Sequence, residues 1–302
     1  MPPARKPPEL VGCVFRGRDV IADGLLSRDQ LRSTAWRRVL QGVYADADLP
    51  DSHGIRIRAA RMLAPPSAVV TGRSAAYLLG ARGLVDAGAP VEIAVPAHAR
   101  FGPVGGLRIR KVAVPPAEVL LVGGFRCTTG LRTALDLARA EPWEDSVPAL
   151  DVLLASGIVR LDELRRAAAE LTGVRGARIA RAAAAFADPR AESPPESRLR
   201  LLLARAGLPA VPQFVVRDAD GRFVARVDLA YPELCLAVEY DGAWHAEDGQ
   251  FARDRQRLNR LVAAGWVVLH VTAADLRRPD QLVARVRALR AARGRGSGAA
   301  DA

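Results

Sequence analysis

The stretch RVDLAYPELCLAVEYDGAWH, in the last third of the chain, constrains the fold more than any other. Two runs rich in β-forming residues, 223–230 and 234–240, are short enough to be strands and are separated by a turn. Asp228 lies near the end of the first run, and Glu239 and Asp241 lie near the end of the second. Carboxylates among residues of buried type are costly unless a cation neutralises them. The stretch therefore indicates a metal-dependent active site.

The spacing of these acids predicts how they meet. If the two runs form an antiparallel hairpin that turns at residues 232–235, Asp228 falls directly opposite Glu239 and shares its face. Asp241 shares that face as well, because strand side chains alternate with a period of two. A slip of one residue would separate the acids. The alternative is that Glu239 and Asp241 close a solvated strand end and Asp228 caps a turn.

Mg²⁺ or Mn²⁺ is the cofactor that this pattern predicts, with Asp228 and Glu239 as its ligands. Mg²⁺ takes oxygen from one or two carboxylates and completes its shell with water and substrate phosphate. It would stabilise the charge that develops in a phosphodiester displacement and help to generate hydroxide.

The segment 195–290 resembles the nuclease-like family related to the very-short-patch-repair (Vsr-like) endonuclease, in the PD-(D/E)XK or restriction-endonuclease-like superfamily. The resemblance runs in order through PPESRLRLLLARAGLP, Pro212-Gln213, VDLAYPELCLAVEYDGAWH and DRQRLNRLVAAGWVVLHVT. It implies a metal-binding acid on the central strand, a second acidic position, an acid on the first helix and a histidine that acts as base. The matching residues here are Asp228, then Glu239 with Asp241, then Glu196, and then His245.

One departure from that superfamily concerns its lysine. The chain has two lysines, Lys6 and Lys111, and neither lies in this segment. His245, Gln213 or an arginine would have to fill the role, and histidine is the better proton acceptor near neutral pH. A histidine packed beside Trp244 is the alternative for His245.

The surrounding pattern fits an α/β nuclease core, with a strand at 213–217, a helix at 251–264, a strand at 266–271 and a helix at 280–292. Glu196 begins an amphipathic helix, where a carboxylate also favours the helix dipole, and that capping role is its alternative. On the helix 251–264, Arg257 and Arg260 share a face with Asp254 and are candidates for contact with DNA phosphate. A solvated helix face is the alternative.

Charge points to a polyanionic partner. The net charge is +11, and all of the 44 basic residues except the two lysines are arginine. The excess gathers near the end of the chain at Arg285, Arg287, Arg290, Arg293 and Arg295, which could follow a DNA backbone. No apolar run is long enough to span a bilayer. Three widely spaced cysteines suit a reducing cytoplasm, which is the expected location.

The front of the chain suggests a second DNA contact. Ser27 can cap a helix through Gln30 and Leu31, residues 36–40 are expected to form a second helical turn, and residues 42–44 a short strand. This string, GLLSRDQLRSTAWRRVLQGVYAD, resembles the N-terminal winged-helix domain of AbiEi-type antitoxins, whose shape places a helix in the major groove. The residues that would contact DNA are Arg28, Arg32, Arg37 and Arg38. Packing within the protein is the alternative.

The middle region alternates apolar strands with helices and is similar to the body of the same antitoxin-like family. Thr129 is expected to cap a helix on which Arg132 and Asp136 pair, and His53 and His98 are expected at the surface because neither has a partner at ligand spacing.

The sequence thus predicts an α/β multidomain protein: a winged-helix-like domain at 1–60, an α/β middle domain at 61–190 and a restriction-endonuclease-like domain at 191–302. The leading hypothesis is a metal-dependent deoxyribonuclease with DNA as partner. The second is an inert DNA-binding regulator or antitoxin, with a cognate toxin or a second copy of the chain as partner. The third is a protein-interaction module that does not bind nucleic acid.

Overall fold

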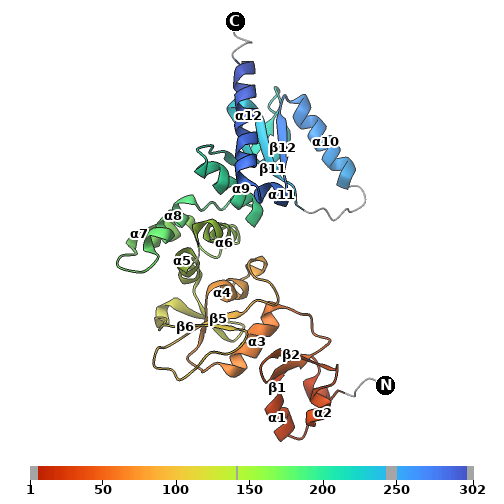
Figure 1. Ribbon diagram of the computed structural model, residues 1–302, viewed down its shortest axis with the longest axis vertical. Coiled ribbons are helices and arrows are strands. Elements are labelled where there is room, and N and C mark those ends of the chain that lie inside the picture. The colour runs from red at the N-terminus through yellow and green to blue at the C-terminus, as the bar shows by residue number, and fades with distance from the viewer. Residues whose placement is uncertain (1–5, 141, 243–249, 298–302) are drawn as a thin grey trace. The chain divides into compact units, whose positions relative to one another are not determined.

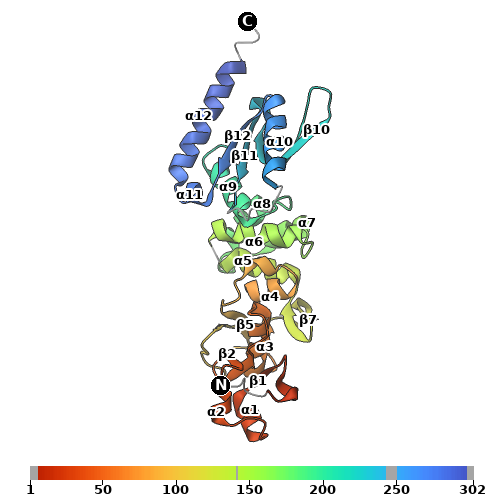
Figure 2. The same ribbon diagram turned by 90° about the vertical axis from the view of Figure 1, so that its right-hand side faces the viewer.

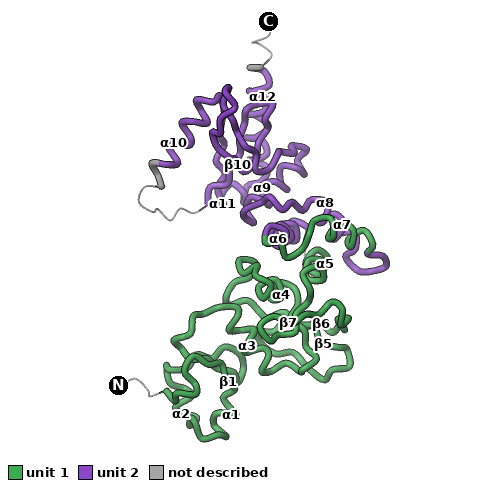
Figure 3. The backbone as a smooth tube through the Cα atoms, turned by 180° about the vertical axis from the view of Figure 1, so that it is seen from behind, with its two compact units in different colours: residues 1–140, 156–170 green, residues 141–155, 171–302 purple. Residues whose placement is uncertain are grey.

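The computed structural model describes residues 6–140, 142–242 and 250–297, and the α/β multidomain class predicted from the sequence is confirmed (Figure 1). The chain divides into two compact units (Figure 3). The front region and most of the middle region fall in the first unit, whereas residues 141–155 and 171–190 of the middle region fall in the second. The first unit holds residues 1–140 and 156–170, and the second holds residues 141–155 and 171–302.

A small antiparallel sheet of strand order β1-β3-β2 opens the first unit. Phe15 and Trp36 meet edge to face beneath it, with ring centroids 5.1 Å apart, in a core shared with the short helices. Ser27 begins α2 with a capping box, in which its hydroxyl accepts from the Gln30 N–H and the Gln30 side chain accepts from the Ser27 N–H. The elements are a 3₁₀ turn at Pro8–Leu10, β1 (Val14–Arg16), α1 (Gly17–Ala22), α2 (Arg28–Leu31), β2 (Trp36–Leu40) and β3 (Val43–Asp46).

The helical turn predicted at residues 36–40 is wrong, because these residues form strand β2. Trp36 pairs with Asp46 and Arg38 pairs with Tyr44 across the hairpin to β3, whose short strand was correctly predicted. Trp36 and Leu40 are buried at the two ends of β2, and Arg38 between them is exposed. Pairing with β3 therefore determines the conformation of this segment.

The middle of the chain forms a mixed sheet of order β6-β5-β4-β8-β7. Helix α3 packs against this sheet and also against the small front sheet, so both share one apolar cluster. Thr129 accepts from the Arg132 N–H at the start of α5, as predicted. The elements are α3 (His53–Leu63), β4 (Val69–Val70), α4 (Gly72–Leu78), β5 (Val91–Val95), β6 (Leu107–Lys111), β7 (Val119–Val122), β8 (Phe125–Thr128), α5 (Gly130–Ala140) and α7 (Leu161–Glu170), with 3₁₀ turns at Arg82–Leu84 and Pro116–Glu118.

His53 is a correction to the sequence analysis, because it is buried and not at the surface. Its Nε2 lies 2.8 Å from the Ser74 hydroxyl oxygen, which also accepts from the Glu92 N–H at 2.9 Å. Burial, together with nearby Arg56, lowers the pKa of His53 to about 4. His98, by contrast, is exposed as predicted.

The second unit is built on a sheet of order β12-β11-β10-β9, in which β11 and β12 are parallel and the other pairs are antiparallel. Helices α9 and α12 cover one face and α10 covers the other (Figure 2). The predicted strands and helices of this region are confirmed to within a few residues. The elements are α6 (Trp143–Ala155), α8 (Ala177–Phe186), α9 (Pro194–Arg205), β9 (Val211–Arg217), β10 (Phe223–Tyr231), β11 (Leu236–Tyr240), α10 (Gln250–Ala263), β12 (Val267–Val271), α11 (Ala273–Leu276) and α12 (Pro279–Ser297).

A buried polar cluster joins α6 to α9 inside the second unit. Asp151 of α6 is 1% exposed and accepts from the Ser197 hydroxyl at 2.6 Å and from Arg200 Nη2 at 2.7 Å. The Asp188 N–H donates to its other oxygen at 2.7 Å. Burial raises the pKa of Asp151 in spite of these partners.

Within the described part of the chain, no helix combines the length and the apolar character that crossing a bilayer requires.

Candidate active site

The candidate site lies where β10 and β11 stop pairing. Leu229 is opposite Val238 and Tyr231 is opposite Leu236, which confirms the predicted hairpin register. Continuing that register places Asp228 opposite Glu239. A 3₁₀ turn at Pro232–Leu234 connects the two strands.

At this point the side chain of Asp228, and not a backbone carbonyl of β10, accepts the hydrogen bond from β11. Its Oδ2 accepts from the Tyr240 N–H at 2.8 Å, so the carboxylate holds β11 where the ladder of backbone bonds ends. The pKa of Asp228 is raised from 3.8 to about 6: burial is the main cause, Glu196 and Glu239 also raise the pKa, and the Tyr240 N–H and Arg257 lower it. Glu196 and Glu239 thus lie near enough to oppose the ionisation of Asp228.

Glu239 is 6% exposed and forms a two-pronged ion pair with Arg257 of α10. Arg257 Nη1 lies 2.9 Å from Glu239 Oε2, Nη2 contacts Oε1, and Nη2 also donates to the Arg226 carbonyl at 2.8 Å. The paired guanidinium geometry is the strong form of this interaction. In this structure the charge of Glu239 is therefore balanced by an arginine side chain.

Glu196 lies in the first turn of α9, where its carboxylate bonds to groups at the start of the helix, as its alternative capping role expects. Its Oε1 accepts from the Ser193 hydroxyl at 2.8 Å, and its Oε2 accepts from the Glu192 N–H at 3.1 Å. Oε2 also accepts from Gln213 Nε2 at 3.1 Å. Because Glu196 also raises the pKa of Asp228, it belongs to the same cluster of charges.

Gln213 is a residue whose conformation the sequence did not predict. Its φ is 51°, in the left-handed region that non-glycine residues rarely adopt, although it lies within β9. Pro212 pairs with Leu229 and Phe214 pairs with Val227, so the constant register sets Gln213 opposite Asp228. The strained residue thus lies beside the central acid and directs its amide to Glu196.

His270 is a second residue that the sequence analysis missed. It is exposed on β12, and the parallel register pairs it directly with Glu239. Gln213, Asp228, Glu239 and His270 consequently follow one another across four neighbouring strands. Only the pairing of β12 with β11 reveals this, because His270 is far from the acids in sequence.

The other predicted residues of this region have different outcomes. Asp241 is partly buried, and its N–H donates to the Val271 carbonyl at 2.7 Å, which extends the pairing of β11 with β12. His245 and Trp244 lie outside the described residues. Arg260 is exposed on α10, on the side of the helix that carries Arg257.

The donor set can be tested against the predicted Mg²⁺ or Mn²⁺. Among the residues that the structure describes, no group of three or more His, Cys, Asp or Glu side chains is arranged to hold a metal ion. Mg²⁺ requires only one or two carboxylates in addition to water and phosphate. Asp228 and Glu239, which the hairpin register sets opposite each other, supply two carboxylates for that smaller set, although Glu239 is paired with Arg257 in this structure.

The front arginines differ in how far they are free to contact DNA. Arg28 and Arg38 are exposed, and Arg32 forms an exposed ion pair with Asp29 at 3.7 Å. Arg37 instead donates to the Leu49 carbonyl at 3.2 Å and forms an ion pair with Asp51. Arg37 therefore supports the fold, and the exposed members remain candidates for DNA contact.

The arginines of α12 are largely engaged within the second unit. Four of them bond to backbone carbonyl groups or lie over an aromatic ring, and Arg295 is exposed. Arg285 donates to His270 at 3.4 Å, Arg287 to Ala206 at 2.9 Å, and Arg293 to Leu234 at 2.8 Å and to Gly265 at 2.9 Å, while Arg290 lies 4.6 Å from the centre of the Tyr231 ring.

Comparisons with known proteins identify relatives in sequence. No protein-family model matches the chain. Uncharacterized protein MT2308 and uncharacterized protein Rv2248, from two strains of Mycobacterium tuberculosis, are each 34% identical over 260 residues. In each case the match covers 85% of this chain and 93% of the relative.

Among solved structures, the crystal structure of the RV2827C protein from Mycobacterium tuberculosis matches 64% of this chain and 76% of its own chain. The identity is 16% and the TM-score is 0.37, which supports no conclusion about function.

Proposed function

Because the chain belongs to the same family as MT2308 and Rv2248, whose names assign no activity, we propose a function from the site itself: a Mg²⁺- or Mn²⁺-dependent DNA endonuclease. The observation that carries the proposal is the hairpin register, which places Asp228 opposite Glu239 where two strands part, with Glu196 near enough to raise the pKa of Asp228 as well. Burial is the main cause of the raised pKa of Asp228, and Glu196 and Glu239 add to it, so a divalent cation at this position would stabilise the ionised carboxylates. The resemblance of this region to the Vsr-like nuclease family supports the proposal.

Asp228 and Glu239 would hold the metal ion, with water and substrate phosphate as its other ligands. When bound, the ion supplies stabilisation of developing phosphate charge and a lowered pKa for attacking water. Glu196 and Gln213, joined by a 3.1 Å hydrogen bond, would orient water beside Asp228.

The basic groups of the proposed mechanism are Arg257 of α10 and His245. Arg257 would leave Glu239 when the metal ion binds and donate to the scissile phosphate, a geometry that suits guanidinium. His245 is the proposed base or water-positioning residue, with support from Asp241. The residues proposed to contact DNA are the exposed Arg28, Arg32, Arg38 and Arg260. Arg37 would contribute by stabilising the fold of the front region. A cognate toxin or a second copy of the chain is a further proposed partner.

Plasmid nicking by the purified full chain tests this proposal. We expect cleavage that requires Mg²⁺ or Mn²⁺, and we expect Asp228→Asn to lower its rate at least about a hundredfold, the range typical for loss of a group that stabilises the transition state. Asp220→Asn is the matched control, because it makes the same change in charge at an exposed position in the β9–β10 turn. Equal cleavage by the Asp228→Asn variant, or cleavage without a divalent ion, would refute the assignment.

A second candidate function is a DNA-binding regulator or antitoxin whose nuclease-like site is inert. The two-pronged Arg257–Glu239 ion pair favours it, because that pair already neutralises the proposed metal ligand. The absence of lysine from the second unit's sequence also favours it. It predicts salt-dependent DNA binding by the full chain in a mobility-shift assay, with no cleavage at any metal concentration.

A further inference from the structure

A cavity in the first unit lies far in the sequence from the acidic site and has no role in the proposed chemistry. It has a volume of about 350 Å³ and opens between the end of α3 and the β7–β8 hairpin. That volume is within the range of pockets that bind small organic molecules. At about 30 Å³ for each water molecule in the liquid, the space corresponds to roughly twelve waters.

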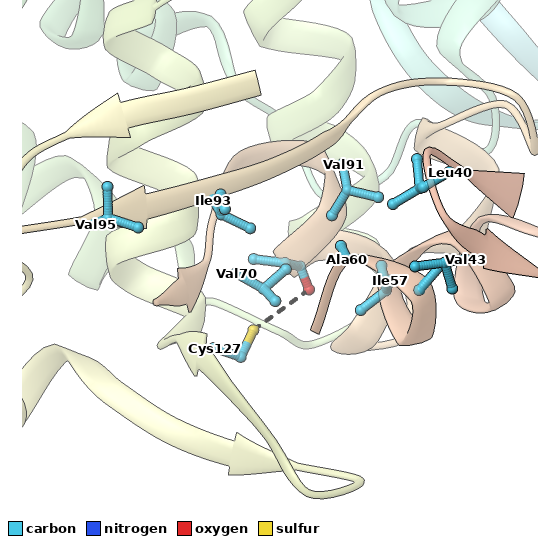
Figure 4. Close-up of a cluster of buried hydrophobic side chains, with 11 residues drawn as sticks. Leu40, Val43, Ile57, Ala60, Val70, Val91, Ile93, Val95 and Cys127 are labelled. Carbon is cyan, nitrogen blue, oxygen red and sulfur yellow. Dashed lines mark hydrogen bonds between the residues drawn. The ribbon is translucent and has the colours of Figure 1, made fainter. Parts of the chain in front are cut away.

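The floor of the cavity is apolar. Ile57 and Ala60 of α3, Val70 of β4 and Ile93 of β5 line it, and all four belong to the buried cluster drawn in Figure 4. These side chains offer no hydrogen-bonding groups, so they favour hydrocarbon over water or a polar group.

The rim is cationic. Arg61 and Arg126 both line the cavity and are exposed. The guanidinium carbon of Arg61 lies 5.2 Å from the centre of the Phe125 ring, which forms one wall. Among the described residues, neither arginine has a carboxylate within ion-pair distance, whereas Arg132 and Arg139 in the same unit are both paired with acids.

The hairpin that forms this wall has a tight two-residue turn. Val122 pairs with Phe125, and Gly123 and Gly124 between them both have positive φ, at 55° and 79°. This tight turn requires residues that tolerate the left-handed region, and glycine does so without strain. A Cβ on Gly124 would also lie 3.3 Å from Arg61 Nη1, so the glycine leaves room for that guanidinium.

We propose that this cavity binds a small apolar monocarboxylic acid, with the hydrocarbon on the aliphatic floor and the carboxylate between Arg61 and Arg126. A guanidinium recognises a carboxylate through paired hydrogen bonds, and two unpaired guanidinium groups at an apolar mouth favour an anion that carries a hydrocarbon tail. A short polar anion would contact only the two arginines of the rim, and a neutral hydrocarbon chain would contact only the apolar floor.

Isothermal titration calorimetry with octanoate, octanamide and acetate tests this assignment on the unaltered full chain. Octanoate is expected to bind saturably at millimolar concentration or below, because it matches both the floor and the rim. Octanamide and acetate are each expected to bind at least about tenfold more weakly, since each lacks one of the two features. The absence of saturable octanoate binding, or equal affinity for octanoate and octanamide, would overturn the proposal.

Variants then locate the site. Arg61→Ala combined with Arg126→Ala should weaken octanoate binding at least about tenfold, whereas Arg58→Ala, an exposed position on α3 outside the cavity, should leave it unchanged. Ala64→Phe should fill the cavity from the end of α3, where the backbone is extended, and abolish binding. If the Arg58→Ala variant loses as much octanoate affinity as the double variant, the location is refuted. The comparison of octanoate with octanamide uses the unaltered chain, so it does not depend on the folding of any variant.

Discussion

Replacement of Asp228 by asparagine is expected to stabilise the second unit at neutral pH, because the ionised carboxylate is unfavourable where it lies. The pKa of Asp228 rises from 3.8 to about 6 in the folded chain. At 1.36 kcal/mol for each pKa unit, this shift of about two units makes ionised Asp228 cost about 3 kcal/mol relative to the unfolded chain. Asparagine keeps an oxygen that can accept from the Tyr240 N–H, and it carries no charge.

The sign of the pH dependence follows from the direction of the shift. A carboxyl group with a raised folded-state pKa binds its proton more tightly when folded, so stability falls as the pH rises from about 4 to about 6. Below about pH 4 both states are protonated, and the parent and the Asp228→Asn variant should be equally stable. Above about pH 6 the variant should show its full advantage of about 3 kcal/mol.

Urea unfolding followed by peptide-resolved hydrogen exchange measures this effect, since peptides from β10 and β11 report the second unit separately from the first. Asp220→Asn is the control, because its exposed carboxylate in the β9–β10 turn should contribute little at any pH. If the parent and the Asp228→Asn variant are equally stable at neutral pH, or if the difference between them does not change with pH, the reasoning is refuted.

Three further predictions concern other parts of the chain. Arg200→Ala should lower the free energy of unfolding of the second unit by about 3 kcal/mol, measured by urea unfolding, because it leaves Asp151 buried without its ion pair. An unchanged unfolding midpoint would contradict this. Gly130→Ala should destabilise the first unit by about 1–3 kcal/mol in urea unfolding followed by hydrogen exchange, because the added Cβ would lie 2.2 Å from the Ile158 carbonyl oxygen. Hydrogen-exchange protection of α5 equal to that of the parent would count against this prediction. Arg28→Ala should reduce the salt dependence of DNA binding by about one phosphate contact in a titration followed by fluorescence anisotropy, and an identical slope would remove this residue from the interface.

Local patterns predicted the hairpin of the acidic site well. The β-rich runs around Pro232 and the position of each acid were sufficient to set Asp228 opposite Glu239, and the structure has that register. Alternation on a strand and the location of a turn are properties of neighbouring residues, so the sequence carries them directly. The capping roles of Ser27 and Thr129 were predictable for the same reason.

Features that depend on distant residues could not be predicted in this way. Residues 36–40 contain helix-compatible residues, yet they pair with β3 and form a strand. His53 is buried because Ser74, 21 residues further along, lies against its ring nitrogen. The ion pair of Arg257 with Glu239 arises only when α10 packs on the sheet. In each case tertiary contacts override or supplement the local preference.

Titration of Mn²⁺, followed by electron paramagnetic resonance, tests the central claim most directly, because the proposed nuclease requires a divalent cation between Asp228 and Glu239. The parent and the Asp220→Asn variant are expected to bind Mn²⁺ at a saturable site, and the Asp228→Asn variant is expected to bind at least about tenfold more weakly. Equal Mn²⁺ affinity in all three proteins, or no saturable binding by the parent, would contradict the claim and leave the DNA-binding alternative.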